Sequence, residues 1–159
     1  MIIKVDRFES NFMRSLPVTY ELLSSANLYV HPAVSKITIH GSRGPADDFE
    51  PNSDVDLYLI VEGAPAPGGI PQEELVRDVI TTTLLNWNSS VELDLAVAFK
   101  TRECDMRCFD HVEYDEAVCS AAATDCFGVY KIKKGFSGYV KNSGMHMKRM
   151  YPCMVVWKR

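Results

Sequence analysis

The chain has 159 residues, of which 47% are hydrophobic and 24% charged, proportions typical of one soluble globular domain. No apolar run approaches the roughly eighteen residues that a membrane-spanning helix requires, and no signal peptide is apparent. We therefore expect a cytoplasmic protein that does not act at a membrane. The five cysteines are an odd number at irregular spacing, which favours reduced thiols over a disulfide framework.

Charge is unevenly distributed along the chain. Residues 1–99 carry 6 Lys and Arg against 14 Asp and Glu, whereas residues 100–159 carry 11 against 7. After Asp125 there are eight basic residues and no acidic one. The acidic part suits a metal site, and the basic part suits a polyanionic ligand or an acidic partner surface. A solvated surface that balances the acidic part is the open alternative.

In chain order, residues 1–16 carry no clear pattern. Apolar residues with a period near 3.6 predict a helix over 17–30, opened by a proline and ended by a His-Pro pair. Alternating, β-branched residues predict a strand over 35–40. Residues 43–53, rich in Gly, Pro and Asn, are expected to be loop, and residues 54–61 form a second strong strand pattern.

The later elements are less uniform. Residues 63–71 are a Gly- and Pro-rich loop, residues 72–87 predict an amphipathic helix, and residues 91–99 predict a third strand. Beyond these, 115–124 is a candidate helix and 127–140 a candidate hairpin. The order of helices and strands predicts a single α+β or α/β domain.

Acidic residues alternate with apolar ones in two of the predicted strands. Strand periodicity places Asp54 and Asp56 on one face, and the same arrangement places Glu92 and Asp94 on one face of the later strand. Adjacent carboxylates repel unless a cation lies between them, and hard divalent ions such as Mg²⁺ take oxygen ligands of this kind. A lone Asp-x-Asp is more often an exposed polar face, but the third aspartate favours a metal site.

The turn after the first predicted strand suits a phosphate group. Gly41 lets a phosphate approach the backbone without a Cβ in the way, and Ser42 offers a hydroxyl and an amide. Arg43 is a candidate phosphate contact through its planar guanidinium, with an ordinary surface arginine as the alternative. Eleven residues separate Ser42 from Asp54, which makes the turn a plausible triphosphate cradle beside the carboxylates.

These residues together resemble a known family signature. Residues 39–44, Ile-His-Gly-Ser-Arg-Gly, and residues 51–57, Pro-Asn-Ser-Asp-Val-Asp-Leu, resemble the motif of the polymerase beta-like nucleotidyltransferase superfamily. The likeness is to its small minimal nucleotidyltransferases, antitoxin-like members among them, and to the aminoglycoside nucleotidyltransferases. In that pattern a third carboxylate lies on a later strand, which Asp94 matches. The resemblance covers residues 35–99.

The resemblance implies a fold as well as a site. It implies a short mixed β-sheet flanked by helices, within one domain over residues 1–159. The motif core would be residues 35–99, and residues 100–159 would be an irregular basic extension. One departure is Gly44-Pro45, where minimal members often carry Ala-Arg, and the region after residue 99 matches no pattern that we identify.

The resemblance also implies a reaction. An acceptor hydroxyl would attack the α-phosphate of a nucleoside triphosphate, with ATP as the expected nucleotide, and release pyrophosphate. Asp54, Asp56 and Asp94 would be the catalytic and metal-binding residues, holding two Mg²⁺ ions, with Mn²⁺ as a substitute. Gly41 and Ser42 would hold the β- and γ-phosphates.

The acceptor and the role of the whole chain stay open at this point. A small molecule, a protein or an RNA end could supply the hydroxyl. The alternative function is a partner-binding module, antitoxin-like, that masks a toxin-like protein with little or no chemistry. The three aspartates favour the enzyme, since a binding module has no evident need for aligned carboxylates.

Overall fold

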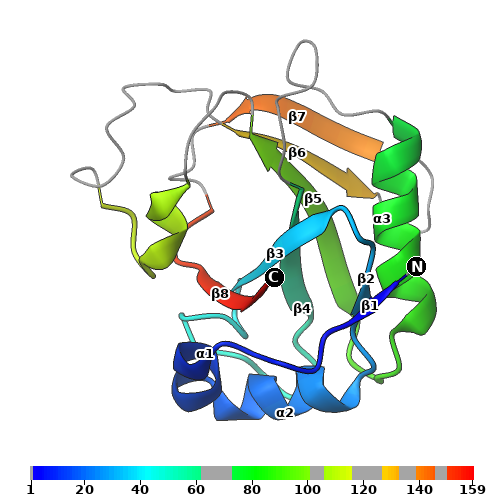
Figure 1. Cartoon of the computed structure of the whole chain (residues 1–159). Coiled ribbons are helices and arrows are strands. Elements are labelled where there is room, and N and C mark those ends of the chain that lie inside the picture. The colour runs from blue at the N-terminus through cyan, green and yellow to red at the C-terminus, as the bar shows by residue number, and fades with distance from the viewer. Residues whose placement is uncertain (1, 62–72, 101–105, 116–126, 133–138, 146–149) are drawn as a thin grey trace.

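The chain folds as a mixed α+β structure (Figure 1). It is a computed structural model that describes residues 2–61, 73–100, 106–115, 127–132, 139–145 and 150–159. The described elements, in chain order, are β1 (Ile3–Lys4), α1 (Ser10–Ser15), α2 (Pro17–Ser25), β2 (Tyr29–Val30), β3 (Val34–His40), β4 (Val55–Val61), α3 (Glu73–Asn86), β5 (Leu93–Lys100), the 3₁₀ helix η2 (Arg107–Asp110), β6 (Phe127–Ile132), β7 (Tyr139–Met145) and β8 (Met154–Lys158).

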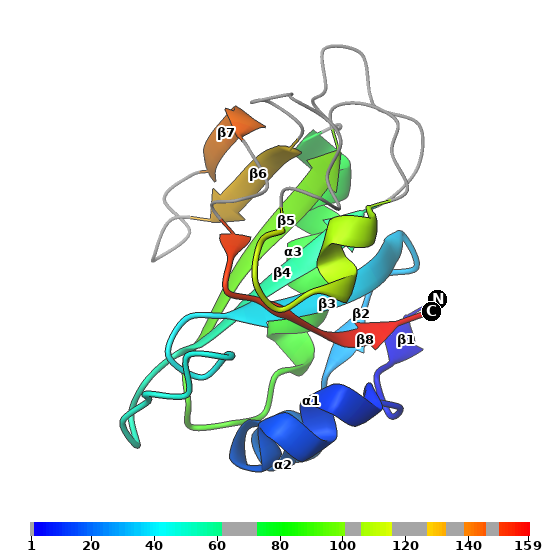
Figure 2. The same cartoon turned by 90° about the vertical axis from the view of Figure 1, so that its left-hand side faces the viewer.

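Within the described residues, the main sheet has six strands in the order β7-β6-β5-β4-β3-β8. Strands β4 and β5 are parallel and lie on either side of α3 in the chain, whereas the other neighbouring pairs are antiparallel. Strands β1 and β2 form a small antiparallel sheet of their own. Figure 2 shows α3 behind the strands of the main sheet. The mixed sheet expected from the sequence is therefore present.

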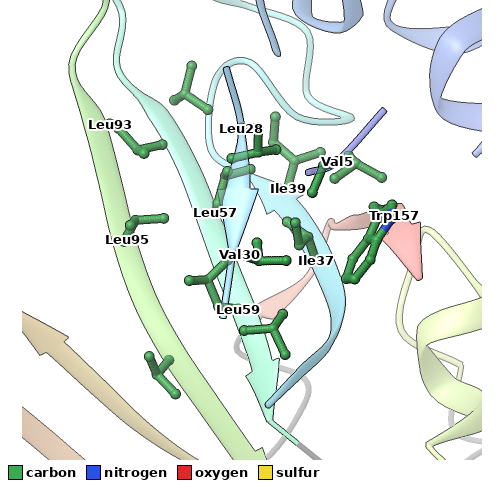
Figure 3. Packing of buried hydrophobic residues seen from close by; sticks show 14 of the residues in the cluster. Val5, Leu28, Val30, Ile37, Ile39, Leu57, Leu59, Leu93, Leu95 and Trp157 are labelled. Carbon is green, nitrogen blue, oxygen red and sulfur yellow. The ribbon is translucent and has the colours of Figure 1, made fainter. Parts of the chain in front are cut away.

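The two faces of the main sheet carry different clusters. On one face, alternate residues of β3, β4 and β5 pack with β2 and α3 into the larger core, which includes Ile37, Leu57 and Leu95 (Figure 3). On the opposite face a smaller cluster joins Ala98 of β5 to Phe109 of η2 and to the segment before β8. Beyond Asp56 and Asp94, β4 and β5 carry apolar residues at both sets of positions, as a sheet that is covered on both sides requires.

Helix α3 follows the predicted amphipathic pattern. Val76, Val79 and Ile80 are buried against the larger core, whereas Leu85 on the outer side is 80% exposed. The hydroxyl of Thr83 donates a hydrogen bond to the carbonyl of Tyr29, which ties the helix to β2. The helix predicted over 72–87 is confirmed as α3, which the structure describes from Glu73 to Asn86. Residue 72 lies outside the described part of the chain.

The helix predicted over 17–30 is too long. Helix α2 ends at Ser25, and Asn27 then takes a left-handed conformation with φ of 56°. Asparagine tolerates that conformation better than most residues, so the chain can turn there. Leu28 and Val30 still enter the core, but from the turn and from β2. Their apolar spacing fits a helix and a turn followed by a strand equally well.

The basic C-terminal region is not an irregular extension. It contributes β6, β7 and β8 to the main sheet, and Val156 and Trp157 of β8 belong to the larger core. The strands predicted over 35–40, 54–61 and 91–99 match β3, β4 and β5, and the predicted hairpin strands match β6 and the start of β7.

Some expected features fall outside the described part of the chain. They are the loop over 63–71, the helix over 116–124 and the turn of the hairpin over 133–138. Asp115, where the candidate helix would start, is not helical. No helix among the described residues has the length and apolar character to cross a bilayer.

Candidate functional site

Three polar side chains form a row across β3, β4 and β5, near one end of these strands. His40 on β3 pairs in register with Asp56 on β4, and Asp56 pairs in register with Asp94 on β5. Residues opposite each other on neighbouring strands point to the same face of a sheet. The row therefore lies on the face of the smaller cluster, at the end of β3 and the beginnings of β4 and β5. Two carboxylates that are distant in sequence are brought side by side.

Asp56 occupies an environment that disfavours its charge. Burial raises the pKa of Asp56 to about 6, and a hydrogen bond with Asp94 and the negative charges of Asp94 and Asp54 act in the same direction. The positive charge of Lys131 partly offsets them. A cation placed among these carboxylates would stabilise the charged form, since opposite charges favour ionisation.

Lys131 supplies a positive charge to the site. Its Nζ lies 2.8 Å from Oδ2 of Asp94, and both side chains are partly exposed, at 49% and 31%. Lys131 is on β6, where it pairs in register with Ala96 of β5, two residues beyond Asp94. A member of the basic C-terminal region thus pairs with an acidic residue of the motif.

Gly41 packs directly against Asp56. Its φ is +71°, a conformation that residues with a Cβ rarely adopt. A Cβ added at Gly41 would lie 2.2 Å from Oδ2 of Asp56, closer than any real contact. The turn continues with hydrogen bonds from the amide of Gly44 to the carbonyl of Gly41 and from the amide of Asp48 to the carbonyl of Ser42. Because Gly41 has no side chain, its backbone can lie directly against the carboxylate of Asp56.

Arg43 holds its own loop together. Its side chain is only 3% exposed, and its Nε and Nη2 donate hydrogen bonds to the carbonyls of Ser53 and Pro51 at 2.8 and 3.1 Å. Its guanidinium also lies 4.6 Å from the ring centre of Phe49. The carbonyl of Arg43 accepts a hydrogen bond from Thr19 of α2. The arginine fixes the loop that leads into Asp54, so its donors are directed at the protein.

His40 and Tyr58 stack beside the carboxylates. Their ring centres are 4.1 Å apart and the rings are 10° from parallel. Burial lowers the pKa of His40 to about 4, with the charge of Asp94 opposing and that of Lys131 adding to the effect. His40 is therefore neutral at physiological pH. Its Nδ1 is buried and has no hydrogen-bond partner among the described residues.

The structure brings some of the predicted site residues together and directs one of them elsewhere. Asp56, Asp94 and Gly41 lie together, and Asp54 is an exposed residue just before β4 whose charge reaches Asp56. Ser42 is half-buried in the turn that follows Gly41. Arg43, the third predicted nucleotide contact, is turned into its loop.

The carboxylates of Asp54, Asp56 and Asp94 are chemically suited to a hard divalent ion, because carboxylate oxygens are the ligands that Mg²⁺ and Mn²⁺ prefer. Among the described residues, no three His, Cys, Asp or Glu side chains are arranged to hold a metal ion. Asp94 is instead bonded to Lys131, and Asp56 shares a hydrogen bond with Asp94. Metal binding by Asp54, Asp56 and Asp94 would require these oxygens to exchange their present partners.

Sequence reasoning missed Tyr58 and Lys131 as members of the site. Tyr58 could have been found, since it continues the alternation of Asp54 and Asp56 along β4. Lys131 carried no comparable signal, because its place depends on which strand lies beside β5. No protein-family model, curated protein or solved structure matches the chain. Function therefore has to come from the chemistry of the site itself.

Proposed function

We propose that this chain is a metal-dependent nucleotidyltransferase with the nucleotidyltransferase fold. It would move a nucleoside monophosphate from a nucleoside triphosphate, with ATP as the expected donor, to an acceptor hydroxyl and release pyrophosphate. The observation that carries the proposal is the in-register pair of Asp56 and Asp94, with the Gly41 backbone packed against Asp56. Paired carboxylates beside an open backbone turn suit a metal-bound triphosphate.

Each residue has a distinct role in this proposal. Asp54, Asp56 and Asp94 would hold the divalent ions, Mg²⁺ or Mn²⁺, which would neutralise charge on the phosphates and lower the pKa of the acceptor hydroxyl. The turn at Gly41 and Ser42 takes the β- and γ-phosphates. Arg43 acts as a positioning residue, because it fixes the loop before Asp54.

The transfer itself needs one base and one leaving group. Asp94, on β5, accepts the proton of the acceptor hydroxyl. The hydroxyl oxygen forms a bond to the α-phosphorus while the bond from that phosphorus to the α–β bridging oxygen breaks. Pyrophosphate leaves with the electron pair of the broken bond.

A second candidate is a partner-binding module with little or no chemistry. The observation that favours it is the ion pair of Lys131 with Asp94, because that lysine balances part of the charge of the site without a metal ion. In this case the site residues would help to shape the fold, and a toxin-like protein is the expected partner.

One assay separates the two candidates. The full chain is incubated with each of the four labelled nucleoside triphosphates and Mg²⁺, and label is followed into small-molecule, protein and RNA acceptors. Nucleotide binding is measured in parallel by calorimetry, with and without Mg²⁺. The enzyme proposal expects binding that depends on Mg²⁺ and is lost in Asp54→Asn with Asp56→Asn, while the circular dichroism spectrum is unchanged.

The opposite result is equally clear. Full-strength, Mg²⁺-dependent binding by the double variant would remove the carboxylates from the nucleotide site. Absence of transfer to every acceptor class, together with tight binding of a partner chain, would establish the module in place of the enzyme.

A further inference from the structure

The ion pair between Lys131 and Asp94 joins two regions that the proposed reaction does not otherwise connect. Asp94 is a proposed metal ligand on β5, and Lys131 comes from β6 in the basic C-terminal region. The Nζ–Oδ2 distance of 2.8 Å makes this a direct, charge-assisted hydrogen bond. A metal ion that used the same oxygen would have to displace the ammonium group.

The position of Lys131 indicates that its effect covers the whole row. Its charge acts on Asp56 and on His40 as well as on Asp94. Arg43, another cation of the motif region, is bonded to the carbonyls of its own loop. Lys131 is thus placed to balance the carboxylates when no metal ion is bound.

We propose that Lys131 is an internal counter-ion that competes with free divalent metal ions for Asp94, so that metal enters the site together with the triphosphate. The proposal rests on the proposed nucleotidyltransferase function and adds an order of binding to it. A free metal ion must break the ion pair and leaves the ammonium group without a partner. A metal–triphosphate complex brings phosphate oxygens that the displaced ammonium can bind, so the exchange costs less.

Removal of the lysine charge provides the test. Lys131→Met keeps much of the side-chain length without the charge, and Lys131→Gln serves as a second neutral variant. Lys131→Arg retains the charge. Lys158→Met is the matched control, because Lys158 forms an ion pair with Glu9 at 3.4 Å and is similarly exposed, at 57%.

The first measurement is Mn²⁺ affinity of the full chain without nucleotide, by electron paramagnetic resonance at low salt. Lys131→Met and Lys131→Gln are expected to bind Mn²⁺ about 1.5- to fivefold more tightly than the wild type, which is the range that a partly exposed ion pair contributes. Lys131→Arg and Lys158→Met should match the wild type. The gain should shrink as salt is added, because exposed charges are screened.

The second measurement repeats the titration with a non-hydrolysable triphosphate. In the wild type the triphosphate should raise Mn²⁺ affinity more than it does in Lys131→Met, because the two ligands are coupled through the lysine. Equal or weaker Mn²⁺ binding by both neutral variants overturns the inference, even if the wild type binds metal and nucleotide. Failure of the wild type to bind nucleotide with metal instead overturns the proposed function.

Discussion

The two sides of β4 near its beginning differ in burial and in polarity. Val55, Leu57 and Leu59 point into the larger core, and each is fully buried. Asp56 and Tyr58, the residues between them, are only half-buried on the opposite side and face charged or aromatic neighbours. Burial of the apolar side stabilises the strand. The polar side can therefore hold two carboxylates close together, although their mutual repulsion is unfavourable. Along β4, residues that stabilise the fold thus alternate with residues of the proposed site.

The largest expected effect lies on the polar side. Asp94→Asn should lower nucleotide transfer by about 10²–10⁴-fold, because the variant cannot accept the proton of the acceptor. Triphosphate binding should change much less, since Gly41, Ser42 and the other two aspartates remain. Single-turnover kinetics and calorimetry measure the two effects separately.

Glu92→Gln is the control for this substitution. Glu92 precedes β5 and is exposed, so its loss should change transfer only a few-fold. Near wild-type transfer by Asp94→Asn, with Glu92→Gln inactive, would assign the role to the other carboxylate.

The next effect lies on the apolar side. Leu57→Ala should reduce the free energy of unfolding by about 2–5 kcal/mol, because it leaves a cavity in a fully buried layer. Asp56→Asn, one residue away, should not reduce it at pH 8, because the substitution removes a charge that the site disfavours. Urea denaturation followed by circular dichroism gives both values. If the two variants lose stability equally, the two sides of β4 are not separated in this way.

A smaller effect is expected where the backbone meets the carboxylate. Gly41→Ala should cost about 1–2 kcal/mol of stability, because the positive φ is strained for any residue with a Cβ. It should also weaken Mg²⁺-dependent nucleotide binding, since the new Cβ pushes Asp56 aside. Thermal unfolding and calorimetry test both points.

Asp47→Gly is the control for the turn. Asp47 also has a positive φ, 49°, but it is exposed and already carries a Cβ. Glycine accepts the same conformation, so the substitution should change stability by less than about 1 kcal/mol and leave nucleotide binding intact. Weakened nucleotide binding in Asp47→Gly would assign the loss to the loop in general.

The smallest effect is a change in titration. Without metal, the carboxyl carbon of Asp56 should titrate with a pKa of about 6 in a carbon-13 NMR experiment. Asp94→Asn should lower that pKa, because it removes a neighbouring negative charge, whereas burial still keeps it above the ordinary value. An unchanged titration would mean that the two carboxylates do not interact.

The shifted pKa of Asp56 also makes the free energy of unfolding of the metal-free protein depend on pH. The folded chain holds the Asp56 proton more tightly than the unfolded chain does, so this stabilising contribution is complete below about pH 4 and is lost as pH rises through about 6. His40 acts in the opposite sense. Its pKa is lowered to about 4, so its contribution is present above about pH 6.5 and is lost as pH falls through 4.

The sequence was informative where local periodicity decides the structure. Alternation identified β3, β4 and β5, and the helical stripe identified α3. The same alternation placed Asp54 and Asp56 on one side, although it could not show that Asp94 lies in register with Asp56. Register depends on how the α3 crossover aligns two strands, which no single strand pattern contains.

The sequence was uninformative where partners are distant. Helix α2 ends just before Asn27, which has a left-handed conformation. The sequence did not predict this end, because the apolar spacing there fits both a helix and a strand. The place of β8 beside β3 and of β6 beside β5 could not be read from basic segments with no strong alternation. For the same reason Lys131 was counted among residues suited to an external partner, although its neighbour is Asp94 of the same chain.

The parallel pairing of β4 and β5 has a consequence for the order of folding. The two strands are separated by 31 residues, from 62 to 92, so their pairing is a non-local event that follows loop closure. Asp56 and Asp94 therefore meet only when that event is complete. We expect their repulsion to slow the pairing of β4 with β5. Refolding should accordingly be faster at pH 5 than at pH 8, a difference that Asp56→Asn removes.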